Sequence, residues 1–377
     1  AAKAAADAIT KPEITSEAGI LYDVTNGRVL FEKNADEKLA PASTTKLMTA
    51  LLVLEKSKLD DKVTFSKTAV TNLESGAVKI GLVEGDQVSV KDCLYGLLLK
   101  SANEVANGLA EHVSGSISAF ADLMNAKAKE LGCTNTHFVN PNGLNSDQQY
   151  TTCRDMAKIA AAAFANQTLC QIDSTLSYKF PATKAAAART ITPGHKMLYP
   201  NDSRYYAGIV GGKTGYTSKA GNTLVTCVEK DGVRMVAVIL KSKSTHYADT
   251  KKMLDYGYQY VNTEKGNTTG NSTTTTTTAK QETAGKWVQD NGSWRYEFAD
   301  GTKAVGTIYT IDAADFGFDP DGKMVTGWKM FGTDWYYFES NGTMAKNAWR
   351  QDSGKWFYLG ADGKIVRNTT IDNKYKV

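Results

Sequence analysis

Residues 40–54 read APASTTKLMTALLVL, a polar entry followed by an almost unbroken apolar run. Pro41 suits the entry turn of a helix, and Ser43 and Thr44 stand where helix N-termini favour hydroxyl groups. The apolar residues that follow would cover nearly every side of this helix, so we predict that it is buried. Three residues' separation would bring the Ser43 hydroxyl and the Lys46 amine together. Because burial disfavours the charged ammonium, Lys46 could serve as a base and Ser43 as a nucleophile.

A Ser-x-x-Lys spacing alone is a weak signal, because a chain of this length should contain about one by chance. Two further tripeptides occur once each, Ser101-Ala102-Asn103 and Lys213-Thr214-Gly215. With the Ser-x-x-Lys run they form nearly the motif set of penicillin-binding proteins and serine β-lactamases, in the expected order. The first 260 or so residues therefore resemble the serine-type D-alanyl-D-alanine carboxypeptidases, the low-molecular-mass penicillin-binding proteins.

The Ser-Ala-Asn run falls between two helical segments, 90–100 and 104–111, so its side chains should project from a loop. Beside the nucleophile, the Ser101 hydroxyl could pass a proton and the Asn103 amide could hold a substrate carbonyl. Taken alone, Ser-Ala-Asn is more often a helix cap.

Three strand-like segments should pair antiparallel: 207–217, 223–228 and 233–240. The glycines of the first, Gly215 among them, leave room for another backbone, as an edge strand that receives an extended peptide requires. Lys213 supplies a fixed positive charge and Thr214 a hydroxyl, which together suit a C-terminal carboxylate. The family resemblance further implies an oxyanion hole built from the backbone N–H groups of Ser43 and Tyr216.

Other polar residues give weaker signals. Residues 140–144 read NPNGL, a turn that we interpret as structural, although the resembled family usually has His where Asn142 stands. Residues 192–198 differ from the Asn-rich loop of many relatives, so we assign no substrate contact there.

The four histidines accompany no Asp motif, which argues against a Ser-His-Asp triad. The five cysteines lack metal-ligand spacing and favour buried free thiols, with one disulfide as the alternative. We expect no metal or other cofactor.

The composition of the chain limits the kinds of partner that we expect it to bind. A formal net charge of +4 over 377 residues, without a run of basic residues, gives no reason to propose nucleic acid. No apolar segment is long enough to span a bilayer. The chain opens with AAKAAA, without an initiator Met or a secretory signal, so we interpret the start as a mature end and predict secretion.

Two strand-like runs, 18–24 and 28–33, flank Asn26-Gly27, which is a strong hairpin signal. Together with the helical segments, they predict an α/β (α+β) domain with an antiparallel sheet and flanking helices. The family resemblance implies that this domain is of the penicillin-binding/β-lactamase type. After about residue 262 the sequence becomes rich in Thr, Asn and Gly, which is typical of a solvated linker. We predict three parts: a serine D,D-peptidase domain at 1–262, a Thr-rich linker at 263–284 and aromatic repeats at 285–377.

All six tryptophans lie in the last part, in three pairs seven residues apart, and turn glycines recur there every 20 to 21 residues. This period predicts a β-hairpin solenoid with Asn-Gly or Asp-Gly turns between units. The units resemble the choline-binding and glucan-binding repeats of Gram-positive surface proteins. Five aromatic residues are candidates for binding a wall polymer: Trp328, Trp335, Tyr337, Trp349 and Trp356. The unit at 308–318 lacks both tryptophans, and simple packing of aromatics remains the alternative.

The resemblance implies a secreted enzyme of the Gram-positive cell wall that removes the terminal D-Ala from peptidoglycan stem peptides. Ser43 would attack the carbonyl, Lys46 would take its proton and Ser101 would pass a proton to the leaving D-Ala. β-Lactams would be covalent inhibitors, and a choline-bearing teichoic acid or a wall glycan would bind the repeats. The alternatives are a β-lactamase, a D,D-transpeptidase, or a non-catalytic protein that binds the wall or senses β-lactams.

Overall fold

The computed structural model describes residues 2–266, 280–281, 285–290, 292–299, 301–312, 314–331, 334–352, 355–366, 370–371 and 375–376. The chain divides into two compact units, Ala1–Thr269 and Gly270–Val377. Most of the predicted linker at 263–284 lies outside the described residues. No helix within the described ranges is long and apolar enough to cross a membrane.

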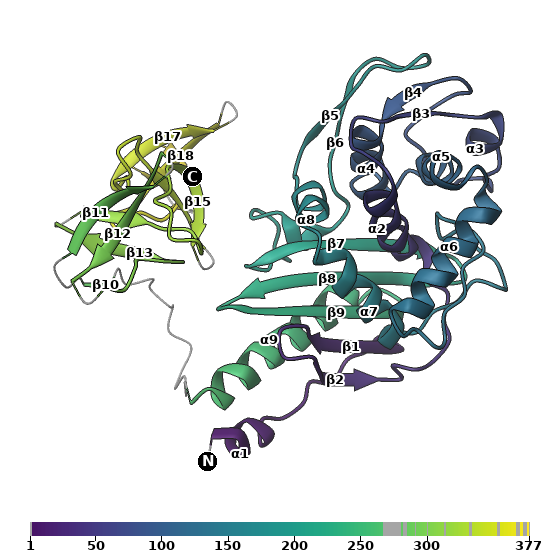
Figure 1. Cartoon of the computed structure of the whole chain (residues 1–377). Helices are drawn as coiled ribbons and strands as arrows, with labels where there is room; N and C mark the ends of the chain where they lie inside the picture. The colour runs from purple at the N-terminus through teal and green to yellow at the C-terminus, as the bar shows by residue number, and fades with distance from the viewer. Residues whose placement is uncertain are drawn as a thin grey trace. The chain divides into compact units, whose positions relative to one another are not determined.

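An antiparallel sheet of five strands forms the centre of the first unit, in the order β2-β1-β9-β8-β7 (Figure 1). Its strands are β1 Ala18–Asp23, β2 Arg28–Lys33, β7 Ile209–Thr217, β8 Gly221–Lys230 and β9 Val233–Ser242. The predicted N-terminal hairpin and the three predicted C-terminal strands are thus confirmed. The order places β7, which carries the Lys-Thr-Gly run, at one edge of the sheet, as an extended peptide would require.

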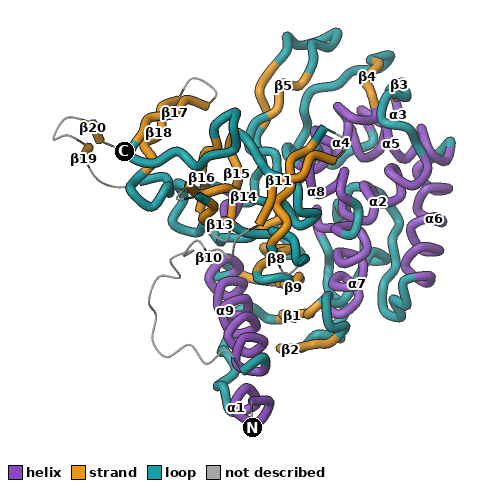
Figure 2. Tube along the Cα trace, turned by 60° about the vertical axis from the view of Figure 1, so that its left-hand side comes forward, coloured by secondary structure: helices purple, strands orange, loops and turns teal. Residues whose placement is uncertain are grey.

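Both faces of the sheet are covered, and strand β9 shows why. Alternate side chains of a strand point to opposite faces, so Val236 and Val238 join one hydrophobic cluster while Ala237 and Ile239 join another. Helix α9 (His246–Glu264) covers the second face and α1 (Ala2–Asp7) packs on α9, whereas α7 (Cys153–Phe164) packs on the first face. Figure 2 shows α1 and α9 side by side, apart from the remaining helices.

The other helices of the first unit gather on the α7 side of the sheet (Figure 1). They are α2 Lys46–Lys56, α3 Lys67–Thr71, α4 Val90–Leu98, α5 Asn103–Ser114, α6 Ile117–Glu130 and α8 Gln167–Asp173. Two small hairpins and two 3-10 turns complete the unit: β3 Lys62–Thr64 with β4 Gln87–Ser89, β5 Tyr178–Phe180 with β6 Arg189–Ile191, η1 Ala42–Thr45 and η2 Lys196–Leu198.

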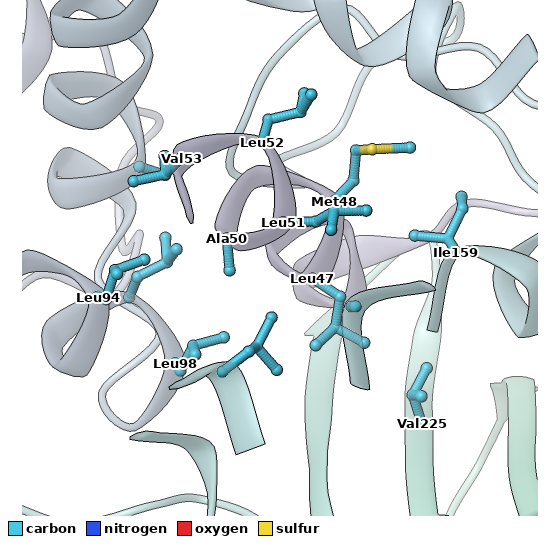
Figure 3. Packing of buried hydrophobic residues seen from close by; sticks show 14 of the residues in the cluster. Leu47, Met48, Ala50, Leu51, Leu52, Val53, Leu94, Leu98, Ile159 and Val225 are labelled. Carbon is cyan, nitrogen blue, oxygen red and sulfur yellow. The ribbon is translucent and has the colours of Figure 1, made fainter. Parts of the chain in front are cut away.

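Helix α2 is buried on nearly all sides, as the apolar run at 47–54 predicts. Its first eight residues, 46–53, are all buried. Figure 3 shows Leu47 and Ala50 among side chains from α4, α7 and β8, including Leu98 and Val225. Truncating such a buried leucine to Ala typically costs about 2–5 kcal/mol of unfolding free energy, so this helix is a rigid support for the residues before it.

The start of α2 differs from the prediction. Residues 42–45 form the 3-10 turn η1, and no side-chain hydroxyl caps either η1 or α2. The Thr44 hydroxyl instead donates to the Pro41 carbonyl at 2.6 Å. Ala42, just before the serine, adopts a left-handed conformation with φ of 48°, which is uncommon for a residue with a Cβ. The capping role predicted for Ser43 and Thr44 was therefore wrong, because this local turn leaves the Ser43 hydroxyl free for another partner.

The second unit is a series of β-hairpins. Its strands are β10 Lys280–Gln281, β11 Gly285–Asp290, β12 Ser293–Phe298, β13 Ile308–Ile311, β14 Ala314–Gly317, β15 Gly327–Phe331, β16 Asp334–Phe338, β17 Ala348–Asp352, β18 Lys355–Leu359, β19 Thr370–Ile371 and β20 Tyr375–Lys376. The strands from β11 to β20 form five antiparallel pairs, β11 with β12, β13 with β14, β15 with β16, β17 with β18 and β19 with β20. Strand β10 pairs parallel with β13. Gly322 and Gly342 adopt positive φ between successive hairpins, at the predicted Asp-Gly and Asn-Gly turns.

Candidate active site

Lys46 lies at the centre of a buried hydrogen-bond network. Its Nζ is 2.9 Å from Ser43 Oγ, 2.7 Å from Asn103 Oδ1 and 2.6 Å from the Asn142 carbonyl oxygen. The side chain is 0% exposed, and burial, followed by the charge of Lys213, holds the pKa of Lys46 well below its ordinary value. A neutral amine has two N–H groups and one lone pair. Donating to the two carbonyl oxygens leaves the lone pair for the Ser43 hydroxyl, which is the arrangement of a general base.

The turn at 140–144 belongs to this site, although from the sequence we interpreted it as structural only. Besides the Asn142 carbonyl, its Pro141 carbonyl accepts a hydrogen bond of 2.6 Å from Thr49 on α2. Gly143 has a φ of 90°, and a Cβ there would lie 1.9 Å from the Ala42 carbonyl oxygen. This glycine is therefore needed for the turn to lie against η1, which contains Ala42 and Ser43.

Lys213 forms a second buried amine. Its Nζ donates to Ser101 Oγ at 3.0 Å and to the Thr214 carbonyl at 2.8 Å, and the residue is 2% exposed. Burial lowers the pKa of Lys213 to about 8, against an opposing effect from Asp173. The positive charge expected from the sequence would therefore be present at neutral pH and lost as the pH rises through about 8.

Asp173, at the end of α8, is a residue that sequence reasoning missed. Its Oδ2 accepts a hydrogen bond of 2.6 Å from the backbone N–H of Gly212, next to Lys213. Burial raises the pKa of Asp173 to about 7, with the charge of Lys213 acting in the opposite direction. This carboxyl fastens α8 to β7 and places a titratable group beside the second lysine. A single Asp at a helix end has no sequence signature that would have revealed it.

The Ser-Ala-Asn run connects the two lysines. Ser101, with a positive φ of 61°, contacts Lys213, and Asn103 contacts Lys46. Asn103 is the first residue of α5, and Ala102 before it makes no side-chain cap, so the helix-cap alternative gains no support. The Asn103 Nδ2 already donates to the Val78 carbonyl at 3.0 Å. Its second N–H is what the predicted contact with a substrate carbonyl would use.

The remaining predicted substrate-binding residues follow Lys213 along β7. A Cβ at Gly215 would lie 2.7 Å from the Ser43 backbone nitrogen, so the absence of a side chain lets this edge strand approach the serine. Tyr216, the next residue, is 67% exposed. The segment at 192–198 also reaches this strand, because a Cβ at Gly194 would lie 3.3 Å from Thr214 Oγ1.

The histidines and cysteines lie outside this network, as predicted. His195 is buried, its Nε2 lies 2.9 Å from Thr226 Oγ1, and burial lowers its pKa to about 3, so the ring is neutral. All five cysteines are free thiols, and burial raises the pKa of Cys133 to about 12. Within the part of the chain that the structure describes, no group of His, Cys, Asp or Glu has the arrangement of a metal site.

In the second unit the candidate aromatic residues differ in their surroundings. Trp328 packs edge-on against Tyr337 of its own hairpin and Phe357 of the next, at centroid distances of 5.2 and 5.6 Å. Trp349 lies 5.2 Å from Tyr358. Trp335 is half-buried, whereas Trp356 is 61% exposed.

Trp287 packs against aromatic side chains of the neighbouring hairpin. Its ring lies 4.8 Å from Phe316 and 5.9 Å from Phe318, both in the hairpin region that lacks tryptophan. It adjoins a cluster of buried residues that includes Tyr296 and Tyr309. Trp287 therefore serves aromatic packing, which is the alternative that the sequence left open.

Comparison with known proteins follows the same division into units. A family model described as D-alanyl-D-alanine carboxypeptidase matches residues 5–244, and one described as choline-binding repeat matches residues 325–369. The carboxypeptidase DacF of Bacillus subtilis is 35% identical over 258 residues, which are 66% of this chain and 63% of that protein. DacC of Escherichia coli is 35% identical over 274 residues, 69% of this chain and 65% of that protein. The chain thus matches somewhat less than two thirds of the length of these two relatives.

Solved structures agree with the sequence comparison. The Streptomyces K15 DD-transpeptidase is 32% identical with a TM-score of 0.60, and the match covers 66% of this chain and 99% of that chain. A D-alanyl-D-alanine carboxypeptidase from Mycobacterium tuberculosis is 30% identical with a TM-score of 0.61, covering 66% and 93%. Since the first family model covers more than half of the 377 residues, the chain belongs to the D-alanyl-D-alanine carboxypeptidase family.

Proposed function

We propose that the first unit removes the terminal D-Ala from peptidoglycan stem peptides through an acyl-enzyme on Ser43. The observation that carries this proposal is the buried Lys46 amine, whose Nζ lies 2.9 Å from Ser43 Oγ and within 2.7 Å of two carbonyl oxygens. Family membership supplies the substrate class. The proposed domain spans residues 1–262, although α9 continues to Glu264.

Acylation begins when Lys46 accepts the Ser43 proton as Oγ attacks the carbonyl of the penultimate D-Ala. The backbone N–H groups of Ser43 and Tyr216 stabilise the oxyanion, a role consistent with the close approach of Gly215 to the Ser43 nitrogen. Lys213 and Thr214 bind the free carboxylate of the substrate, which lies along the open edge of β7.

Departure of D-Ala requires a proton on its nitrogen. Ser101 delivers this proton, and the Lys213 ammonium, 3.0 Å from Ser101 Oγ, can replace it. Water then attacks the acyl-enzyme. Its released proton passes through Ser101 back to Lys213, and Lys46 returns its proton to Ser43 Oγ, which releases the shortened peptide and restores the Ser43 hydroxyl. No step requires a metal or an organic cofactor. D,D-transpeptidation is the second candidate, because the fold also matches a structure described as a DD-transpeptidase over 99% of that chain.

Penicillin labelling tests the nucleophile. Intact-mass analysis should show one adduct on the wild type and none on Ser43→Ala, and the wild type alone should release D-Ala from a stem peptide. An adduct that persists in Ser43→Ala would show that the nucleophile is a different residue. Rapid turnover of penicillin would indicate a β-lactamase, and adduct formation without D-Ala release would favour a sensor. Transfer of the acyl group to an added amine would identify a transpeptidase.

We propose that residues 285–377 form a solenoid that holds the enzyme on the wall, with residues 263–284 as a linker. Equivalent hydrogen bonds between hairpins recur along the unit and support this arrangement. The backbone N–H groups of Met324, Met344 and Ile365 donate to the carbonyls of Trp294, Asp315 and Trp335, respectively. From one of these hydrogen bonds to the next, both the donor and the acceptor move along the sequence by one repeat, as in a regular stack of hairpins.

The proposed ligand is a wall polymer, either a choline-bearing teichoic acid or a glycan, at the surface of a Gram-positive bacterium. The match of residues 325–369 to the choline-binding repeat supports this, with Trp328, Trp335 and Trp349 as the main pocket and Tyr337 and Trp356 nearby. Each aromatic cage would contribute on the order of 1–2 kcal/mol, so a multivalent polymer would be needed for firm retention. Free choline and wall glycans should perturb the tryptophan fluorescence of the whole chain. If neither does, the aromatics serve packing alone.

A further inference from the structure

A buried carboxylate, that of Glu104, follows Asn103 at the start of α5 but makes no hydrogen bond to Lys46. Glu104 is the second residue of α5 and is 0% exposed. Its Oε1 accepts hydrogen bonds from three consecutive backbone N–H groups, those of Ile80 at 2.7 Å, Gly81 at 2.8 Å and Leu82 at 3.3 Å. Hydrogen bonds to an ionised carboxylate are stronger than neutral ones, so this oxygen fixes the segment firmly.

The preceding residue binds the same segment. Both the backbone N–H and the side-chain Nδ2 of Asn103 donate to the Val78 carbonyl, at 2.9 and 3.0 Å. The opposite end of that amide accepts the hydrogen bond from Lys46. Residues 103 and 104 therefore attach the segment at 78–82 to the same helix start that holds the catalytic lysine, and movement of the segment would be transmitted to Asn103.

The second oxygen of Glu104 is in a different situation. Among the described residues, no donor forms a hydrogen bond with Oε2, although this atom is buried. A buried carboxylate that is only partly compensated keeps a strong local potential, because protein interiors screen charge poorly.

The charged groups that act on Lys46 are few. Burial, followed by the charge of Lys213 on β7, lowers the pKa of Lys46, whereas Glu104 on α5 raises it. The other buried carboxylates nearby are engaged elsewhere. Asp173 on α8 bonds to the backbone of β7, and Asp155 on α7 accepts from residues 135 and 136.

We propose that Glu104 is a positioning residue for acylation, which fixes residues 78–82 beside Asn103 and supplies the negative potential at Lys46. This inference rests on the proposed function, because it assigns Lys46 the role of base. A more negative potential strengthens a base but also keeps it protonated to higher pH. The position of Glu104 would thus determine the pH at which the serine becomes reactive.

The test measures the second-order rate of penicillin acylation against pH in the whole chain, since this rate reports ionisations of the free enzyme. Glu104→Gln keeps an oxygen for the three N–H groups and removes the charge. Glu104→Asp keeps the charge and shortens the side chain. Asp86→Asn is the matched control, because this buried carboxylate also holds a neighbouring loop, through Val83 N at 2.8 Å and Lys184 N at 2.9 Å, without acting on Lys46.

The acid limb of the profile should move to lower pH in Glu104→Gln, with acylation several-fold slower at the optimum. In Glu104→Asp the limb should stay in place while the rate falls, and in Asp86→Asn the limb should not move. An unchanged limb in Glu104→Gln, or an equal displacement in Asp86→Asn, would overturn the inference. If Glu104→Gln does not fold, a displaced limb in Glu104→Asp would overturn it and a retained limb would support it. A wild type that forms no adduct would overturn the proposed function as well.

Discussion

Replacing Gly143 by Ala should damage both stability and acylation, although the substitution adds a single methyl group. Its φ of 90° is already unfavourable for any residue with a Cβ, which costs about 1–2 kcal/mol. The new Cβ would also lie 1.9 Å from the Ala42 carbonyl oxygen, a backbone atom that no side-chain rotation can remove. The turn must therefore move away from α2.

That movement would weaken two hydrogen bonds of 2.6 Å, from Lys46 to the Asn142 carbonyl and from Thr49 to the Pro141 carbonyl. Each bond contributes about 1 kcal/mol, so the total loss of unfolding free energy should be about 3–4 kcal/mol. Acylation should fall by about 100-fold, because a displacement of about 1 Å in catalytic geometry has an effect of that size.

Gly27 provides the control, since it also has a positive φ, of 66°, but a Cβ there would meet nothing within 4 Å. Gly27→Ala should therefore lose only about 1–2 kcal/mol and acylate normally. Denaturant unfolding and penicillin acylation of both variants provide the comparison. Equal stabilities for the two variants, together with normal acylation in Gly143→Ala, would refute the argument from close approach.

Three further outcomes are expected. Lys46→Arg should acylate about 10²–10⁴-fold more slowly than the wild type despite a retained positive charge, because a guanidinium stays protonated; a normal rate would remove Lys46 from the role of base. The kcat/KM for a stem peptide should fall as pH rises through about 8, where Lys213 loses its proton, and a C-terminally amidated peptide should be cleaved much more slowly than the free acid. Equal rates for acid and amide would contradict the assigned carboxylate contact. A chain truncated after Thr269, the boundary of the first unit, should release D-Ala normally but fail to sediment with purified cell walls. Sedimentation equal to that of the whole chain would exclude anchoring by the repeats.

The sequence predicts those features that depend on side-chain periodicity and on motif chemistry. The hairpin around Gly27, the buried α2, the three C-terminal strands and the pairing of Ser43 with Lys46 all follow from local patterns. Pairing of β1 with β9 joins residues more than 200 positions apart, and no local pattern specifies it. It could be expected only from the resemblance to a known family.

The parts of the site that the sequence did not reveal are contributed by backbone atoms and by burial. Lys46 binds the carbonyl of Asn142, and any residue type has a carbonyl, so the turn at 140–144 carried no chemical signature. Glu104 and Asp173 resemble ordinary helical carboxylates in the sequence, and only the three-dimensional packing shows that both are buried. The same holds for Lys213, whose burial changes a permanent charge into a titratable one.

The open edge of β7 has a consequence for handling the protein. A strand at the edge of a sheet presents unpaired backbone groups that can join another chain, and this one must stay open if a peptide is to bind there. The exposed edge that admits a substrate peptide therefore also allows two molecules to associate through this strand. A covalently bound β-lactam that covers the edge should reduce self-association during concentration and storage, so acylated protein should remain monodisperse longer than the free enzyme.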